Sequence, residues 1–380
     1  RQALTEEDRQ GRALFQAWAE EAGCQVHVDT IGNLFATRPG ADSEADPILV
    51  GSHLDTQPTG GRFDGVYGVL AGLEVIRTLN DFDLHTRSPL IVASWTNEEG
   101  ARFPPAMMGS GVWAGEFDLE TTYQTCDRDG RSVREALEEI GALGATPATP
   151  CSLKGAIELH IEQGPILEQA GDSIGIVTGV QGIRWYDLVL TGLPCHAGPT
   201  PMEGRRDPVQ MLPELLPRVY RLATDNAPWG RVTLGDLVSQ PGSRNTVPES
   251  IQLSVDLRHP DQATLDNMHQ ALQTLVRELS SEAVGIALRE VWHSPAVAFD
   301  QGVIDVISNA VEITGYPAQQ MVSGAGHDSV YVSRVAPTAM IFIPCQDGLS
   351  HNEAEYASPE DITAGCNVLL NAVLSLDSAN

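Results

Sequence analysis

Two short apolar runs in the first hundred residues end in clusters of polar residues, and this pattern constrains the fold more than any other feature. Residues 47–50 lead into Gly51-Ser52-His53-Leu54-Asp55, and residues 90–95 lead into Thr96-Asn97-Glu98-Glu99-Gly100. Buried parallel strands deliver polar side chains in this way to the carboxyl edge of a sheet. Residues 65–79, between the two runs, have apolar positions at helical spacing. The section therefore predicts an α/β fold.

The rest of the chain divides into segments that differ in the spacing of their apolar residues. Residues 185–191 and 251–257 alternate apolar and polar positions, as half-exposed antiparallel strands do. With helix candidates at 208–224 and 263–278, they predict a small α+β domain inserted in a larger one. After residue 300 the chain again shows helical and strand-like segments in turn, as in the first section. We expect one discontinuous domain, 1–181 with 297–380, and an inserted domain at 182–296.

Residues of types that bind metal ions follow the first apolar run. His53 and Asp55 leave its end together, and Asp64 follows in the glycine-rich Gly60-Gly61-Arg62-Phe63-Asp64-Gly65. Imidazole binds Zn, Mn, Co or Ni, and its second nitrogen usually donates to a carboxylate, a role for which Asp55 is placed. A single His near an Asp is more often an ordinary hydrogen-bonded pair. The recurrence of such residues favours a metal site.

More residues of metal-binding types lie at other predicted strand ends and in a loop near the C-terminus. Neighbouring carboxylates repel unless a cation or a proton separates their roles, so Glu99 would bind metal while Glu98 takes a proton from water. His160 ends an apolar run and His351 lies in a polar loop. An exposed acidic turn is the ordinary alternative for Glu98-Glu99. Spacing alone leaves open whether folding brings these residues together.

Composition argues against two classes of partner. The formal net charge of −28 repels polyanions, and Lys154 is the only lysine, so no basic patch is available for a nucleic-acid backbone. No apolar run approaches the roughly 20 residues that a membrane-spanning helix needs, and residues 1–11 lack a signal-peptide pattern. The six cysteines form no C-x-x-C pair and are expected to be reduced. We expect a cytoplasmic location.

The ordered motifs resemble the amidase/carbamoylase branch of the M20 metallopeptidase superfamily, from residue 5 to residue 374. That branch includes N-carbamoyl-L-amino acid hydrolases, β-ureidopropionases and allantoate amidohydrolases. The motifs that carry the resemblance are Gly-Ser-His-Leu-Asp-Thr, Phe-Asp-Gly, Asn-Glu-Glu-Gly-Ala-Arg-Phe, Glu-Leu-His-Ile-Glu-Gln-Gly, His-Ala-Gly-Pro-Thr-Pro-Met, Ser-Arg-Asn-Thr-Val-Pro, Asp-Leu-Arg-His, Ser-Gly-Ala-Gly-His-Asp and Ser-His-Asn-Glu.

The resemblance implies a di-metal catalytic domain with an inserted lid and dimerisation domain. It implies two divalent ions per subunit, zinc being expected and manganese, cobalt or nickel being alternatives. Asp64 would bridge the ions, with Glu99 and His351 completing one site and His53 and His160 the other. Glu98 would be the general base that activates water between the metals.

The resemblance also implies the substrate contacts. His196, Asn245 and Arg258 would reach from the inserted domain into the partner subunit's active site in a homodimer, and Gln163 would approach from the metal-bearing subunit. Arg258 offers a planar fork suited to a carboxylate.

Other polar residues receive less direct roles. The glycine-rich segment with Gly324 and Ala325 would offer backbone N–H groups to an anionic substrate end. His327 and Asp328 are assigned to support of the ligands. Arg184, Arg205 and Arg206 are interpreted as structural or surface charges.

The expected activity is hydrolysis of an N-carbamoyl amino acid, α-L or β (for example N-carbamoyl-β-alanine), to the amino acid, ammonia and carbon dioxide. This would be a hydrolase of linear amides that acts on carbon–nitrogen bonds other than peptide bonds. Allantoate, another ureido acid or an acyl-amino acid is the alternative substrate. A catalytically inactive dimeric binding protein is the alternative outside enzymes, and it predicts a lost ligand or base, whereas none is missing.

Overall fold

The chain divides into two compact units in the computed structural model, which describes residues 1–379. Unit 1 comprises Arg1–Gly179 with Ala298–Asn380, and unit 2 comprises Val180–Val297. Unit 2 therefore starts two residues before the predicted inserted domain, 182–296, and ends one residue after it. The roles expected of the units, catalysis for unit 1 and a lid or dimerisation for unit 2, stay predictions.

Unit 1 is built on a nine-stranded sheet with the order β1-β2-β4-β3-β5-β16-β6-β14, and β15 pairs with β6. The strands are β1 (Gln25–Val28), β2 (Leu34–Arg38), β3 (Ile48–His53), β4 (Leu90–Trp95), β5 (Gly155–Ile161), β6 (Ile174–Val180), β14 (Val297–Ala298), β15 (Ala318–Ser323) and β16 (Thr338–Ile343). The central strands β4, β3, β5 and β16 run parallel, whereas β2 and β6 pair antiparallel with β4 and β16. The α/β prediction is confirmed for this unit.

Strand β3 is longer than the predicted segment 47–50. Gly51, Ser52 and His53 continue the parallel pairing with β4 as far as Trp95. His53 therefore belongs to the strand itself rather than to the loop that follows it. This places its side chain on the rigid edge of the sheet.

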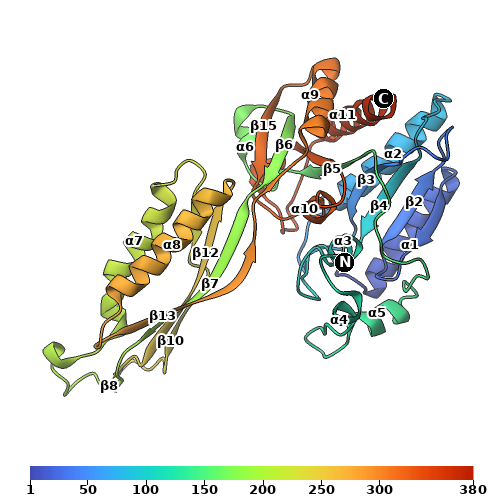
Figure 1. Cartoon of the computed structure of the whole chain (residues 1–380). Coiled ribbons are helices and arrows are strands. Elements are labelled where there is room, and N and C mark those ends of the chain that lie inside the picture. The colour runs from blue at the N-terminus through green and yellow to red at the C-terminus, as the bar shows by residue number, and fades with distance from the viewer. Residues whose placement is uncertain (380) are drawn as a thin grey trace. The chain divides into compact units, whose positions relative to one another are not determined.

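Helices cover both faces of this sheet (Figure 1). They are α1 (Glu6–Glu21), α2 (Val66–Asp81), α3 (Met108–Trp113), α4 (Leu119–Tyr123), α5 (Val133–Glu139), α6 (Ile166–Ala170), α9 (Gln301–Thr314), α10 (Ser329–Val332) and α11 (Pro359–Ser378), with the 3₁₀ turn η3 (Gln346–Gly348). Adjacent strand residues point to opposite faces: Gly155 of β5 meets Leu376 of α11, while Ala156 packs with Trp113 of α3 and Val332 of α10. Strand β5 is therefore covered on both faces.

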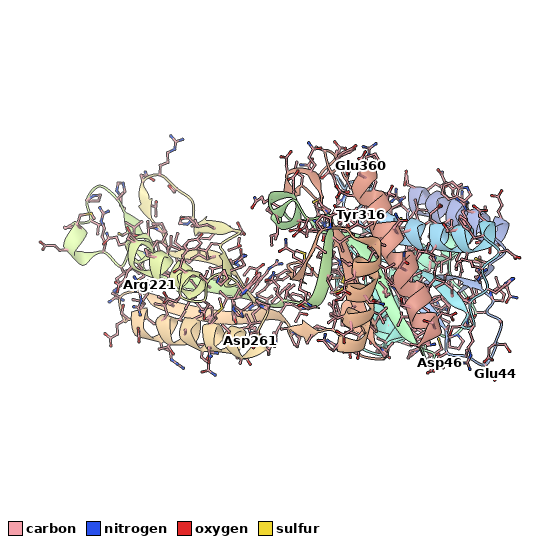
Figure 2. All side chains as sticks on the ribbon, turned by 90° about the horizontal axis from the view of Figure 1, so that it is seen from above. Glu44, Asp46, Arg221, Asp261, Tyr316 and Glu360 are labelled. Atoms are coloured by element: carbon pink, nitrogen blue, oxygen red, sulfur yellow. The ribbon has the colours of Figure 1, made fainter. Side chains whose placement is uncertain are left out.

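The helices that close unit 1 are also tied by polar contacts. Asn367 of α11 donates a hydrogen bond of 2.9 Å to the hydroxyl of Tyr316, which follows α9 (Figure 2). Thr5 caps α1 by accepting from the N–H of Asp8 at 3.3 Å, as threonine commonly does at the start of a helix. None of the helices in the described part of the chain has the length and apolar character that crossing a membrane requires.

Unit 2 has a five-stranded antiparallel sheet, ordered β10-β12-β7-β13 with β9 on β12, and a separate β8–β11 ribbon. Its elements are β7 (Gly182–Thr191), β8 (Cys195–His196), η1 (Met202–Gly204), η2 (Pro208–Met211), α7 (Leu212–Thr224), β9 (Arg231–Thr233), β10 (Leu237–Gln240), β11 (Thr246–Val247), β12 (Ser250–His259), α8 (Gln262–Leu279) and β13 (Gly285–Ser294). Helices α7 and α8 lie side by side on one face of the sheet (Figure 1). The α+β prediction is confirmed for this unit.

Two arginines predicted to be structural or surface charges have structural contacts in unit 2. Arg184 of β7 donates to Asp266 of α8 at 2.7 Å and to Glu290 of β13 at 2.8 Å. Arg205 donates to backbone carbonyl groups within residues 197–200 at 2.6 to 3.2 Å. Both guanidinium groups therefore join segments of unit 2.

Candidate functional site

The carboxyl edge of the parallel strands in unit 1 gathers the predicted ligands. His53 ends β3, His160 is the last but one residue of β5, and Glu98 and Glu99 follow β4. Because neighbouring parallel strands present their carboxyl ends at one edge of a sheet, these side chains converge. Asp64 joins them from the loop between β3 and α2.

Asp64 lies at the centre of this cluster. Its Oδ1 lies 3.4 Å from Nε2 of His53 and 3.2 Å from Nε2 of His160, and its Oδ2 lies 3.4 Å from Nε2 of His351. Glu99 Oε2 also lies 3.3 Å from His351 Nε2. The result is two groups with a shared carboxylate, His53–Asp64–His160 and Asp64–Glu99–His351, and within each group the ligand atoms lie within 4.8 Å of one another.

The donor set and its electrostatics fit divalent cations. Burial opposes the charged form of Asp64, but the three histidines outweigh it and hold the pKa of this carboxyl well below its usual range. Burial likewise disfavours protonated His53, yet Glu98 and Asp64 raise its pKa well above the usual value. Negative charge that draws protons onto buried imidazoles also favours a cation in the same place, and mixed imidazole and carboxylate ligands suit Zn, Mn, Co or Ni.

Backbone carbonyls decide which nitrogen of each buried histidine faces the cluster. Nδ1 of His53 donates to the carbonyl of Asp55, and Nδ1 of His160 donates to the carbonyl of Ile161, both at 2.9 Å. A carbonyl only accepts, so the proton of each neutral ring stays on Nδ1. Nε2 is left to face Asp64 with its lone pair, as a metal ligand requires.

Asp55 differs in part from its prediction. The expected carboxylate bond to His53 is replaced by the backbone carbonyl, because the nearest Asp55 carboxylate oxygen lies 3.9 Å from Nδ1. The carboxylate instead accepts the backbone N–H groups of Glu98 at 3.1 Å and Glu99 at 3.2 Å. Asp55 therefore orients His53 with its main chain and the Glu98-Glu99 pair with its side chain.

Glu98 is buried beside the cluster, with Oε2 lying 3.4 Å from Nε2 of His53. Burial, together with the charge of Asp328, raises the pKa of Glu98 well above its usual value even though His53 acts in the opposite direction. A carboxyl that readily holds a proton at the edge of a ligand cluster is suited to accept one from water and to release it again.

Glu355 is a buried residue of the cluster that the sequence analysis missed. Its Oε1 accepts the backbone N–H groups of Phe63 at 2.9 Å and Asp64 at 3.1 Å, and the hydroxyl of Ser350 lies 3.0 Å from its Oε2. A Cβ at Gly61 would lie 1.9 Å from Glu355 Oε1, so a larger residue there would push this carboxylate away from its hydrogen-bond partners. Glu353, two residues earlier, is exposed, and nothing in the sequence distinguishes the two.

Gln163 joins the same cluster in unit 1. Its Nε2 donates to Asp64 Oδ2 at 2.8 Å and to the Ser350 hydroxyl at 3.2 Å. The Ser350 hydroxyl also lies 3.0 Å from Asp64 Oδ2. Gln163 thus reaches the shared carboxylate directly.

The 323–328 segment lies behind the ligands. The ring of His327 packs edge-on against that of His160 with 4.7 Å between centroids, and its Nε2 lies 3.0 Å from the Ser323 hydroxyl. The N–H of Ala325 donates to the same hydroxyl at 3.1 Å rather than standing open to a ligand. Asp328 is buried and accepts from Ser110. Gly324 belongs to this loop.

The remaining predicted substrate contacts lie in unit 2. His196 of β8 pairs with Thr246 of β11, and the N–H of Ala197 donates to the carbonyl of Asn245 at 2.9 Å, so His196 and Asn245 are neighbours. Arg258 lies on a different strand, β12, and contacts Asp256.

Comparisons with known proteins place this cluster in a family context. The sequence profile of Peptidase family M20/M25/M40 matches residues 49–375. An N-carbamoyl-L-amino-acid amidohydrolase from Rhizobium meliloti is 46% identical over 98% of this chain and 90% of its own length. The allantoate amidohydrolase of Bacillus subtilis is 32% identical over 93% of this chain and 87% of its own length. The crystal structure of an amidase of the hydantoinase/carbamoylase family from Burkholderia multivorans superposes with a TM-score of 0.95 at 49% identity, over 100% of this chain and 92% of that one.

Cation binding should release protons from the cluster. Hydrogen bonds with Asp64 and Glu99 raise the pKa of His351 to about 10 in the metal-free chain, so this histidine is protonated at about pH 8. A cation must displace that proton, and we expect affinity for Zn²⁺ to rise with pH up to about 10. Titration calorimetry at about pH 8 in two buffers of different ionisation enthalpy measures the release. His351→Ala should release fewer protons, and equal heats in both buffers for the unaltered chain would contradict the expectation.

Proposed function

We propose that this chain, which belongs to Peptidase family M20/M25/M40, is an amidohydrolase that removes the carbamoyl group of an N-carbamoyl amino acid. The Rhizobium meliloti relative bears the name of that activity. The observation that carries the proposal is the carboxylate of Asp64, shared by two ligand groups, with Glu98 buried 3.4 Å from a ligand nitrogen of His53. The reaction breaks a carbon–nitrogen bond other than a peptide bond and yields the amino acid, ammonia and carbon dioxide.

The two ligand groups would hold two divalent cations per chain. His53, Asp64 and His160 would hold one ion, and Asp64, Glu99 and His351 the other. Divalent cations in such a centre lower the pKa of water and polarise the carbonyl under attack. Zinc is the proposed metal, with manganese, cobalt or nickel as alternatives, since the ligand types accept all four.

Glu98 would move the protons of the reaction. Its carboxylate accepts a proton as water attacks the ureido carbonyl carbon, and returns that proton to the nitrogen that departs. Asp55 keeps Glu98 in place through the backbone N–H at 3.1 Å. His327, packed on His160, and Asp328 would support the ligand side chains from behind.

Substrate recognition would involve polar groups from both units. In this proposal Arg258 binds the substrate carboxylate, His196 and Asn245 contact the ureido group, and Gln163 acts beside the metal ligands. A homodimer formed through unit 2 would supply the unit 2 residues to a partner's centre. The roles of Gly324 and Ala325, like the cytoplasmic location, stay predictions.

Allantoate or another ureido acid is the second candidate substrate, and the Bacillus subtilis relative of that name is the observation that favours it. Both substrate classes present a ureido group and a carboxylate, so the same ligands and base serve either. An inactive binding protein has less support, because every predicted ligand and the predicted base are present and converge in unit 1.

Replacing Glu98 by Gln tests the proton-transfer role. The amide keeps the shape of the side chain but accepts no proton, so we expect kcat to fall by about 10²- to 10⁴-fold. Metal content, measured by plasma mass spectrometry, should stay unchanged. Glu360→Gln is the matched control, since Glu360 is exposed in the first turn of α11 (Figure 2). Turnover at the parental rate in Glu98→Gln would remove Glu98 from the mechanism.

Ammonia release identifies the substrate. The metal-reconstituted chain is assayed with N-carbamoyl-L-amino acids, N-carbamoyl-β-alanine, allantoate and N-acetyl amino acids, and chelator-treated protein is the control. We expect turnover of a carbamoyl amino acid that chelation abolishes and added metal restores, because the metals supply the activated water. Turnover of allantoate alone would favour the second candidate. If the metal-loaded protein releases no ammonia from any of these substrates, both candidate activities are rejected.

A further inference from the structure

One side of the unit 2 sheet carries a linked set of polar side chains, Trp185, Asp256 and Arg258. Tyr186 and Leu257, their neighbours along β7 and β12, belong to the core beneath α7 and α8. Because side chains alternate along a strand, the linked set points to the opposite face of the sheet from these helices. Trp185 and Asp256 are directly paired across the two strands.

Asp256 holds the guanidinium group of Arg258 along one edge. Nε of Arg258 donates to the two carboxylate oxygens at 3.0 and 3.1 Å, and Nη2 donates to Oδ2 at 2.8 Å. A guanidinium offers a carboxylate two such edges, Nε–Nη2 and Nη1–Nη2. Asp256 takes the Nε–Nη2 edge and thereby fixes the plane of the guanidinium group.

Trp185 in turn holds Asp256. The indole Nε1–H donates to Asp256 Oδ2 at 3.0 Å. The ring of Trp185 lies against that of Trp292 on β13, with 4.7 Å between centroids and 47° between planes. The indole is thus fixed from one side by Trp292, and it fixes the carboxylate that sets the direction of the Arg258 fork.

Stability is a weak explanation for this arrangement. The side chains of Arg258 and Asp256 are 29% and 21% exposed, so water reaches the pair and weakens its contribution to folding. Asp187 and Arg289 form another ion pair on the same sheet. The Arg258 pair is also held by an indole donor, whose ring packs at a tilt against Trp292.

We propose that Asp256 is a positioning residue for the Arg258 fork and that Trp185 is a positioning residue for Asp256. The inference rests on the proposed function, in which Arg258 binds the substrate carboxylate. Because Asp256 fixes the plane of the guanidinium group, Arg258 would approach the substrate carboxylate in one orientation, and the ureido group would be held in one direction. Asp256 and Trp185 thereby determine the preference for substrates that carry a carboxylate.

The test compares a carbamoyl amino acid that the chain turns over with its carboxamide analogue. Asp256→Ala removes the carboxylate that binds the guanidinium group of Arg258. Trp185→Phe removes only the indole N–H donor and keeps an aromatic ring. We expect KM for the carboxylate substrate to rise about tenfold in Asp256→Ala and a fewfold in Trp185→Phe, because a misdirected fork loses its bidentate geometry. KM for the carboxamide, and kcat for either substrate, should change less than about twofold.

Asp187→Ala is the matched control, because it removes an Asp–Arg pair from the same sheet without touching Arg258. It should leave both KM values unchanged. An unchanged or lower KM for the carboxylate substrate in Asp256→Ala, or equal rises for both substrates, overturns the proposal. Unfolding temperatures within the range of the control show that a rise in KM is not a folding defect.

Arg258→Ala separates this inference from the proposed function. If that variant keeps the parental preference for the carboxylate over the carboxamide, Arg258 does not bind the carboxylate and the assignment of Arg258 itself fails. If Arg258→Ala abolishes the preference while Asp256→Ala and Trp185→Phe keep it, Arg258 stands and only the positioning role is rejected.

Discussion

The carboxylate of Asp64 is the group around which the site is organised. Its two oxygens approach imidazole nitrogens of His53, His160 and His351 within 3.2 to 3.4 Å. These histidines come from two strands and a loop far apart in sequence, so their convergence depends on the parallel order of the sheet. A buried anion has lost its solvation, so it draws protons onto the imidazoles around it, and cations in the two flanking positions would take the place of those protons.

The supports of the cluster are mostly backbone groups. Carbonyls after His53 and His160 fix the nitrogen that faces Asp64, while the carboxylates of Asp55 and Glu355 hold backbone N–H groups on either side of it. Side chains held in this way lose little freedom when a ligand binds, which favours precise placement of the reacting groups. In unit 2 the corresponding contact is between side chains, where the carboxylate of Asp256 accepts hydrogen bonds from the guanidinium group of Arg258.

Sequence reasoning predicted the main helices and strands, and the residues that it named as ligands lie together in unit 1. It did not predict the backbone hydrogen bonds that surround them. Polar residues after apolar runs located the strand ends, and β4 coincides with the predicted 90–95. Spacing alone left the grouping of the ligands open, since only the pairing of β3, β4 and β5 brings their ends together. Nothing in the sequence distinguished the buried Glu355 from the exposed Glu353. The carboxylate of Asp55 accepts a hydrogen bond from the backbone of Glu98 and not from His53. Both contacts were missed because every residue type except proline offers a backbone N–H, so such donors leave no pattern in a sequence.

Metal stoichiometry of the Asp64→Asn variant tests the shared-carboxylate account most directly. Equilibrium dialysis against Zn²⁺, with plasma mass spectrometry, should find two ions per unaltered chain, one for each ligand group that contains Asp64. Asp64→Asn should weaken both sites together, whereas Asp81→Asn at the exposed end of α2 should bind as the unaltered chain does. Retention of both ions at parental affinity in Asp64→Asn, or a single ion in the unaltered chain, would contradict the account.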